Sequence, residues 1–297
     1  MSYELAGTPI TNYKKMQRYL SLIAFSHTVF ALPFALVGYF IAYREVGFST
    51  RTLILVLFCM IFARSAAMAF NRYIDRDIDA LNPRTAVREI PSGAINANNA
   101  LFLVLFCCAG LIVSTYFINT LCFMLSPVAL IITLGYSLTK RFTALCHLVL
   151  GMGLSLAPIG AYMAGTGRGD YWLPWAFSAV VILWVSGFDI IYALQDEEFD
   201  RENNLNSIPV WLGRNGALML STGLHIACAV LIAAISYYSG FSWLNRLGTL
   251  FFIGMLIYQH RLVSPTDLSR IDRAFFTTNG IACVIYGILT VTDIFLF

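Results

Sequence analysis

Oxygen-bearing side chains recur every four residues in a short stretch that follows an apolar run. The stretch reads NRYIDRDID and places Asn71, Asp75 and Asp79 four positions apart. Residues at this spacing share one face of an α-helix, provided that the helix continues beyond the apolar run. We therefore expect these three side chains to project together.

A second acidic stretch repeats this design later in the chain. It reads DIIYALQDEEFD, and Asp189, Tyr192, Asp196 and Asp200 again fall on one helix face. Asp196 follows Asp75 by 121 residues and four apolar runs, which suggests two parallel units of four helices. A parallel repeat places the two stretches at matching positions on one side of a bundle, where they could converge.

Facing rows of carboxylates repel one another unless a cation lies between them. Mg²⁺ suits oxygen-only ligands, because it keeps several waters and binds one or two carboxylates together with substrate phosphates. The alternative is that both stretches are solvated charge runs, but their helical phase and matching positions favour a site. The predicted ligands of Mg²⁺ are Asn71, Asp75, Asp79, Asp196 and Asp200.

Basic residues lie where a diphosphate would need them. Arg84 and Arg88 are four apart in RTAVREIPSG, and Lys140 and Arg141 occupy the next loop on the same side. Guanidinium groups bind phosphate oxygens in pairs, while lysine supplies a compact charge. We predict that these four residues bind a diphosphate, although loops on the inner side of a membrane are expected to be basic in any case.

Arg64 lies within an apolar run, about two helical turns before the first acidic stretch. A charged side chain inside a membrane span is costly unless it faces the bundle interior. Its side chain could instead extend to the membrane surface. Because Arg64 shares a helix face with Asn71 and Asp75, we assign it to the site. The four histidines, His147 among them, lack metal-ligand spacing and are interpreted as hydrogen-bonded helix residues.

The composition identifies a membrane protein. Of 297 residues, 59% are hydrophobic and only 12% are charged, about half of what a soluble domain carries. This composition excludes a nucleic-acid binder with a basic face, whereas the net charge of +3 says little about partners. Seven cysteines without a CxxC pair make a disulfide framework or a zinc site improbable.

Nine apolar runs predict an all-α polytopic membrane protein with nine transmembrane helices. Each run approaches the roughly 20 residues that a helix needs to cross about 30 Å of hydrocarbon. The runs cover residues 20–42, 53–70, 97–118, 121–137, 144–164, 173–191, 217–238, 243–258 and 274–297.

The distribution of basic residues orients this bundle. With the N-terminus inside, inner segments hold 14 Lys and Arg residues and outer segments hold 4, which predicts a cytoplasmic N-terminus. The expected organisation is a single domain, 1–297, with four-helix units at about 19–140 and 141–260 and a ninth helix at 274–297. We expect a protein of the inner (cytoplasmic) membrane whose acidic stretches face the cytoplasm.

These stretches resemble the motifs of the UbiA-type intramembrane aromatic prenyltransferases. The family patterns NxxxDxxxD, RTAxRxxPSG and DxxYxxxDxxxD are matched by residues 71–79, 84–93 and 189–200. Further similarity lies in YSLTKRF at 136–142 and SIPVWLG at 207–213, so the resemblance extends over almost the whole chain.

The resemblance implies a nine-helix bundle around a cavity that opens to the cytoplasm and, through a side portal, to the bilayer. It implies Mg²⁺-dependent transfer of a polyprenyl group from its diphosphate to an aromatic hydroxy acid of the 4-hydroxybenzoate type, in ubiquinone or menaquinone biosynthesis. Arg64 is then a candidate for binding the diphosphate or an acceptor carboxylate, and Asp189 with Tyr192 for the acceptor's phenol or its proton. The implied partners are polyprenyl diphosphate, the aromatic acid and the lipid bilayer, with no nucleic acid.

Two departures from the family pattern leave the acceptor open. Arg72 stands where many 4-hydroxybenzoate enzymes of the family carry an acid, and Glu89 replaces the usual Pro or Leu. This combination resembles a branch that includes enzymes of the futalosine route to menaquinone, whose acceptor is a dihydroxynaphthoate. A transporter is the alternative from another class, but it should place its ionisable groups near the bilayer midplane instead of at one edge.

Overall fold

The computed structural model describes residues 17–22 and 30–297. This part of the chain is helical and contains no β-strand, apart from an isolated bridge between Ser264 and Asp267. The helices are α2 (Leu32–Val46), α3 (Thr50–Ile74), α4 (Arg76–Leu81), α5 (Ala97–Ile118), α6 (Thr120–Thr139), α7 (Cys146–Thr166), α8 (Trp172–Ala193), η2 (Leu194–Asp196), α9 (Glu197–Glu202), α10 (Ile208–Tyr238), α11 (Trp243–Leu262), the π-helical η3 (Arg273–Thr278) and α12 (Asn279–Leu296).

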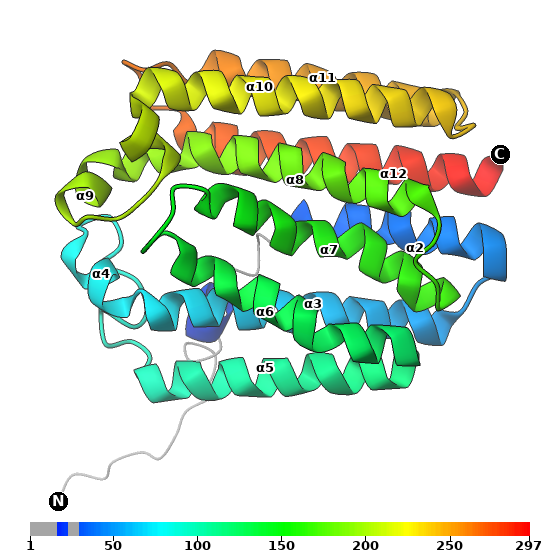
Figure 1. The fold of residues 1–297 in the computed structure, drawn as a ribbon, viewed down its shortest axis with the longest axis horizontal. Coiled ribbons are helices and arrows are strands. Elements are labelled where there is room, and N and C mark those ends of the chain that lie inside the picture. Colours follow the sequence, from blue (N-terminus) through cyan, green and yellow to red (C-terminus); the bar gives the residue numbers. More distant parts are fainter. Residues whose placement is uncertain (1–16, 23–29) are drawn as a thin grey trace, which may run out of the picture.

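The long helices lie side by side in a bundle (Figure 1). Six of them, α2, α7, α8, α10, α11 and α12, form a closed ring in which each packs against the next and α12 packs back on α2. A second group, α3, α5 and α6, joins this ring mainly through the contact of α6 with α7. The short helices α4 and α9 lie together at one end of the bundle, and the C-terminus lies at the other (Figure 1).

Within residues 17–22 and 30–297, seven helical segments are long and apolar enough to cross a membrane, so the chain is an integral membrane protein. They are α3, α5, α6, α7, α8 with its extension to Glu202, α10, and η3 with α12. The other two predicted spans are not confirmed. The span 20–42 lies partly outside the described residues and is represented by the 15 residues of α2. The span 243–258 is present as α11, but polar residues at both of its ends lower its hydropathy.

Helices α2 and α7 pack in close contact. A Cβ atom added at Gly38 of α2 would lie 2.0 Å from the carbonyl oxygen of Pro158 in α7. Small residues let helices approach closely in lipid, where packing replaces the hydrophobic effect between helices. α7 is thereby fixed against α2, and its other side is left to face α6 and α8.

An aromatic cluster fixes α8, the helix that carries the start of the second acidic motif. Trp184 is fully buried, and its ring centroid lies 5.5 Å from that of Phe34 in α2 and 5.5 Å from that of Phe252 in α11. Its indole N–H donates a hydrogen bond to the Asn279 side chain at 2.9 Å, which satisfies the one polar atom of the ring. α8 is thus held by three neighbouring helices one turn and more before Asp189.

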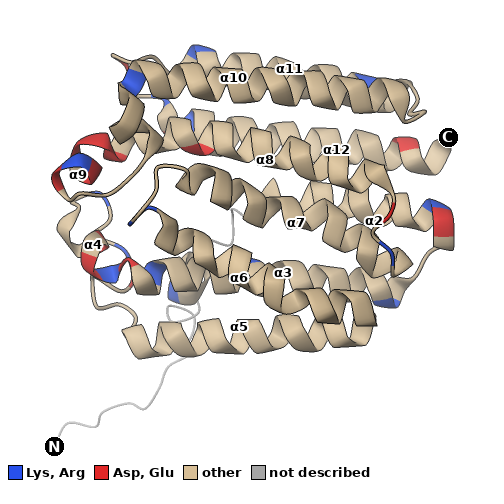
Figure 2. Ribbon diagram, viewed as in Figure 1, with Lys and Arg blue, Asp and Glu red and all other residues tan. Residues whose placement is uncertain are grey.

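Charged residues are concentrated at the two ends of the bundle. Blue and red segments gather around α4 and α9, with a smaller group at the opposite end, and the long helices between them are almost uncoloured (Figure 2). The acidic stretches predicted to converge therefore do lie at the same end of the molecule.

Candidate active site

Both acidic motifs share a backbone break at their middle aspartate. α3 ends at Asp75, whose φ of −91° and ψ of 3° are not helical, and α4 begins at the next residue. Asp196 has nearly the same angles, φ −103° and ψ 3°, and is both the last residue of η2 and the N-cap of α9. The first motif is therefore divided between α3 and α4 at Asp75, whereas the second continues from α8 through the short η2 into α9.

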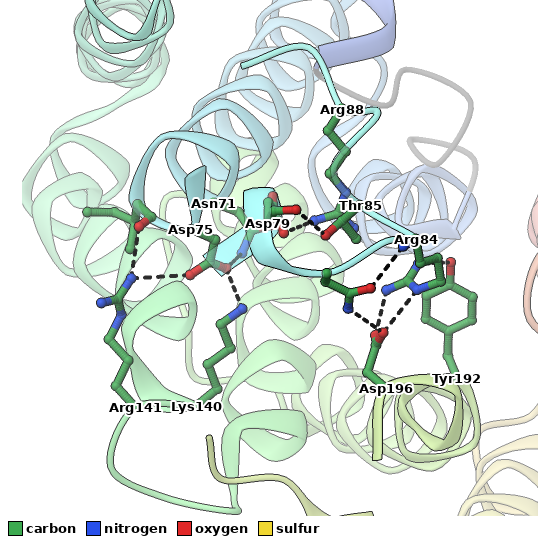
Figure 3. Close-up of polar contacts among 12 residues, drawn as sticks. Asn71, Asp75, Asp79, Arg84, Thr85, Arg88, Lys140, Arg141, Tyr192 and Asp196 are labelled. Atoms are coloured by element: carbon green, nitrogen blue, oxygen red, sulfur yellow. Dashed lines mark hydrogen bonds and ion pairs between the residues drawn. The ribbon is translucent and has the colours of Figure 1, made fainter. Parts of the chain in front are cut away.

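The first motif holds its two carboxylates nearly free of solvent. The Asp75 side chain is 1% exposed and accepts from Lys140 Nζ at 2.6 Å and from Asn71 Nδ2 at 3.1 Å. Arg141 Nη2 lies 3.4 Å from the other Asp75 oxygen (Figure 3). A buried carboxylate without such partners would be strongly destabilising, so Lys140 and Arg141 make the position of Asp75 tenable.

Asp79 is held in a similar way by the loop that follows α4. Its Oδ1 accepts from Arg88 Nη1 at 2.7 Å, and its backbone carbonyl accepts from the Thr85 hydroxyl at 3.0 Å (Figure 3). Its Oδ2 is buried and has no hydrogen-bond partner within the described structure. A buried carboxylate oxygen left open in this way is available to a cation.

Arg84 connects the two motifs across the bundle. Its Nε lies 3.0 Å from Asp196 Oδ1, and its Nη2 donates to the second oxygen, which gives a two-point contact (Figure 3). Asn82 Nδ2 donates to the same carboxylate at 3.1 Å. Burial opposes the charge of Arg84, but the hydrogen bond and charge of Asp196 outweigh it and raise the pKa of Arg84.

Asp200 is the least neutralised acid of the two motifs. No basic side chain lies within ion-pair distance of it in the parts of the chain that the structure describes. The Asp200 carboxylate would be stabilised by an added cation.

The three remaining predicted residues surround the inner part of the site. Asp189 Oδ2 lies 2.7 Å from His147 Nδ1. The Tyr192 ring stacks on Phe275 with centroids 4.1 Å apart, and its hydroxyl lies 3.5 Å from Arg84 Nη1. Arg64 is deeper in the bundle, where its Nε is buried without a hydrogen-bond partner in the described chain.

Two cavities meet at Arg64. A polar cavity of about 300 Å³ is lined by both acidic motifs, and an apolar cavity of about 440 Å³ lies between α3, α5, α6 and α7. Arg64, Tyr136, Leu150 and Leu154 line both, so the two spaces adjoin there. Of the predicted site residues, those that line the polar cavity are Arg64, Asn71, Asp75, Asp79, Arg84, Arg88, Lys140, Asp189, Tyr192, Asp196 and Asp200.

Arg141 does not line this cavity, unlike the other predicted residues. Its side chain is 42% exposed and its Nη2 donates to the carbonyl oxygen of Ile74 at 2.8 Å, at the end of α3. Its contacts support the break at Asp75 and not a direct place beside a ligand.

Other cavity residues were not assigned to the site from the sequence. His147, Asn82, Arg72 and Tyr136 all line the polar cavity. Asn82 could have been found, because it precedes Arg84 in the loop that carries the arginines. His147 is hydrogen-bonded, as expected, but a lone histidine in an apolar run gave no signal of a contact with Asp189.

The donor set fits a magnesium ion that takes most of its ligands from elsewhere. Across residues 17–22 and 30–297, no three His, Cys, Asp or Glu side chains are close enough to form a closed protein cage. The acids are oxygen ligands, and Asp79 has a buried oxygen without a hydrogen-bond partner among the described residues. Such an open set suits Mg²⁺, which binds a few carboxylates, waters and substrate phosphates.

Comparisons with known proteins identify the class to which this helical bundle belongs. The model of the UbiA prenyltransferase family matches residues 31–281. The chain therefore belongs to the UbiA prenyltransferase family, and it is a prenyltransferase.

Two bacterial proteins illustrate the similarity in sequence. The 4-hydroxybenzoate octaprenyltransferase of Aliivibrio salmonicida is 31% identical over 238 residues, which cover 79% of this chain and 81% of that protein. The protein of the same name from Photobacterium profundum is 32% identical over 249 residues, 78% of this chain and 81% of its own.

Solved structures share the fold. A UbiA homologue from Aeropyrum pernix K1 superimposes with a TM-score of 0.82 at 35% identity, over 90% of this chain and 98% of the other. A UbiA homologue from Archaeoglobus fulgidus bound to GPP and Mg²⁺ gives 0.72 at 20% identity, over 94% of this chain and all of the other. The latter likeness establishes the fold alone.

Proposed function

We propose that this protein transfers a polyprenyl group from polyprenyl diphosphate to an aromatic hydroxy acid of the 4-hydroxybenzoate type, with Mg²⁺, in quinone biosynthesis. One observation carries the proposal: both acidic motifs line a single polar cavity that adjoins an apolar cavity at Arg64. The names of the bacterial relatives and the GPP and Mg²⁺ bound by the Archaeoglobus fulgidus homologue point to the same chemistry.

The diphosphate occupies the polar cavity in this proposal. Arg84, Arg88 and Lys140 bind its oxygens, and Arg141 supports them through Asp75. Asn71, Asp75, Asp79, Asp196 and Asp200 are the residues that would hold Mg²⁺. When bound, the metal neutralises the negative charge that builds up on the leaving diphosphate.

The prenyl chain lies in the apolar cavity, whose walls are almost entirely hydrocarbon. These walls exclude water from the allylic cation that forms when the bond between prenyl C1 and the diphosphate oxygen breaks. The electron pair of that bond leaves with the diphosphate. The donor reaches this space from the bilayer, where its chain is already dissolved.

The acceptor ring lies where the two cavities meet. Arg64 binds its carboxylate, since this buried guanidinium has an unsatisfied Nε there. Asp189 accepts the proton of the phenol hydroxyl as a ring carbon bonds to prenyl C1, and Tyr192 lines the same wall. The dienone that results returns to the phenol by tautomerisation, so one proton is released for each prenyl group transferred.

A dihydroxynaphthoate is the second candidate acceptor. Arg72 lines the polar cavity with a buried Nε that has no hydrogen-bond partner in the described residues. An extra unpaired cation next to the first motif favours an acceptor with more oxygen substituents than 4-hydroxybenzoate. The stacked pair Tyr192 and Phe275 presents a flat surface that suits either ring system.

We further propose that the chain is a single domain of the inner membrane, with α4, α9 and the polar cavity facing the cytoplasm. The excess of basic residues in the loops at that end supports this orientation.

The test is an incubation of the purified protein with radiolabelled polyprenyl diphosphate, Mg²⁺ and each aromatic acid in turn. We expect labelled prenylated product with 4-hydroxybenzoate that disappears when EDTA removes the metal. Product formed only with the dihydroxynaphthoate would select the second candidate. No product with either acid, while labelled lipid moves across a vesicle membrane, would contradict the proposal in favour of transport.

A further inference from the structure

His147 lies in the first turn of α7, at a point where three helices meet. Its side chain is buried, with 4% of the residue exposed. Its Nδ1 lies 2.7 Å from Asp189 Oδ2 in α8, and its Nε2 accepts from the backbone N–H of Ile208 at 3.3 Å. The Ser186 hydroxyl donates to the His147 carbonyl at 3.2 Å, so the backbone of this turn is also fixed to α8.

The contact with Ile208 decides which ring nitrogen carries a proton. Ile208 is the first residue of α10, and its N–H is one of the helix donors that no carbonyl within the helix can satisfy. A backbone N–H can only donate, so Nε2 must present its lone pair. The proton of the imidazole is then on Nδ1, and Nδ1–H donates to the Asp189 carboxylate.

This arrangement differentiates the two oxygens of Asp189. Oδ2 is engaged by His147, whereas Oδ1 has no hydrogen-bond donor within the described residues. Asp189 lines the polar cavity and its side chain is 21% exposed. One oxygen is therefore anchored, and the other is available to a ligand in the cavity.

We infer that His147 is a positioning residue that holds the Asp189 carboxylate, through Nδ1–H, in the orientation that receives the hydroxyl of the aromatic acceptor. This inference rests on the proposed function, because it assigns Asp189 to the acceptor. His147 touches no reacting atom itself. Its second contact, with Ile208, fixes the tautomer that makes the donation to Asp189 obligatory.

Two substitutions separate the two hydrogen bonds of the ring. In His147→Asn, the side-chain amide nitrogen lies near the place of Nδ1 and still donates to Asp189. In His147→Gln, the longer side chain places its amide near Nε2, which leaves Asp189 without this donor. We expect the asparagine variant to retain most of kcat and the glutamine variant to lose about ten- to a hundredfold, since small displacements of a reacting group have effects of this size.

The Michaelis constant for polyprenyl diphosphate and the Mg²⁺ concentration for half-maximal rate should stay within about twofold in both variants. The reason is that none of the residues proposed to bind the diphosphate forms a hydrogen bond with His147. His260→Gln is the matched control: this histidine pairs with His225 at 2.8 Å, between α10 and α11. It should leave kcat unchanged. Thermal unfolding in detergent reports whether each variant keeps the fold. If His147→Gln does not fold, the test uses the folded His147→Asn variant. Retention of kcat in that variant supports the inference, and loss of kcat overturns it.

A double-mutant cycle with Asp189→Asn provides the second readout. If His147 acts through Asp189, His147→Gln has little further effect on kcat in the Asp189→Asn background. Full kcat in folded His147→Gln, or effects that multiply independently in the double variant, would overturn the inference. A wild-type protein that prenylates no aromatic acid would overturn the proposed function and this inference with it, whereas an active wild type with an unaffected His147→Gln variant would overturn the inference alone.

Discussion

The two acidic motifs have the same backbone design but different electrostatic surroundings. Asp75 and Asp196 have φ near −100° and ψ of 3°, and a six-residue helix follows each. Yet the Asp75 side chain is 1% exposed and that of Asp196 is 20% exposed. The two motifs share this backbone geometry, while the neighbouring loops determine how each carboxylate is neutralised.

The balance of charge differs in sign between the two motifs. Around the first, Lys140, Arg141 and Arg88 contact two carboxylates, those of Asp75 and Asp79. Around the second, Arg84 contacts Asp196, whereas Asp189 and Asp200 line the same cavity without a Lys or Arg partner among the described residues. The first motif therefore has an excess of positive charge and the second an excess of negative charge. We expect diphosphate oxygens to lie closer to the first motif and the magnesium ion closer to the second.

The largest effect is expected from neutralising the middle aspartate of each motif. Asp75→Asn and Asp196→Asn should each lower kcat/KM about 100- to 1,000-fold, the range found when a group that stabilises transition-state charge is removed. Asp75→Asn should also destabilise the fold more than Asp196→Asn, because the Asp75 side chain is only 1% exposed and its carboxylate is the counter-ion of Lys140. Activity assays and thermal unfolding in detergent measure both effects.

Asp170→Asn is the control for this pair of variants. Asp170 lies between α7 and α8 with its side chain 74% exposed, and it should tolerate the same change. Equal loss of stability in Asp75→Asn and Asp196→Asn would break the distinction between the two motifs.

Arg84 provides the next largest effect, because it joins the motifs. Arg84→Lys keeps the charge but removes the fork that contacts both oxygens of Asp196, so a point charge cannot replace it. We expect the KM for polyprenyl diphosphate to rise about 10- to 100-fold, the equivalent of one or two charge-assisted hydrogen bonds. Arg168→Lys, at an ion pair of 2.7 Å with Glu45 on the opposite end of the bundle, should leave KM unchanged. A KM in Arg84→Lys equal to that of the wild type would show that the bridge does not prepare the diphosphate site.

The second motif is also held from outside the cavity, by Arg214 of α10. Glu197 is buried in α9, and its two oxygens accept from Arg201 at 2.7 Å and from Arg214 at 2.9 Å. Arg214 also reaches Glu198 at 3.2 Å, so it ties the short helix that carries Asp200 to α10. A six-residue helix is too short to be stable without tertiary contacts.

Arg214→Ala should therefore raise the Mg²⁺ concentration for half-maximal activity about tenfold, as loss of residues that orient metal ligands commonly does. Arg201→Ala removes the other partner of Glu197, but that arginine is 60% exposed and belongs to α9 itself. Its loss should change the Mg²⁺ requirement by less than about twofold. The same Mg²⁺ dependence in both variants would mean that α9 is held by other contacts.

The sequence predicted which residues gather here better than it predicted the backbone that gathers them. The four-residue spacing of Asn71, Asp75 and Asp79 survives the helix break, because Asp75 N–H still bonds to Asn71 O at 3.0 Å and Asp79 N–H to Asp75 O at 2.7 Å. A pattern of spacing is the same with and without such a break, so it cannot reveal one. The roles assigned to these residues remain predictions.

Contacts between distant helices were the other part that spacing could not supply. Hydropathy identifies seven spans among the described residues. It does not identify α11, whose ends are polar, or α2, which is short. His147 is 42 residues from Asp189, and its importance appears only when α7 and α8 are packed together. The two acidic stretches were expected to converge from their matching positions in the chain, but the ion pair between Arg84 and Asp196, 112 residues apart, was not predicted.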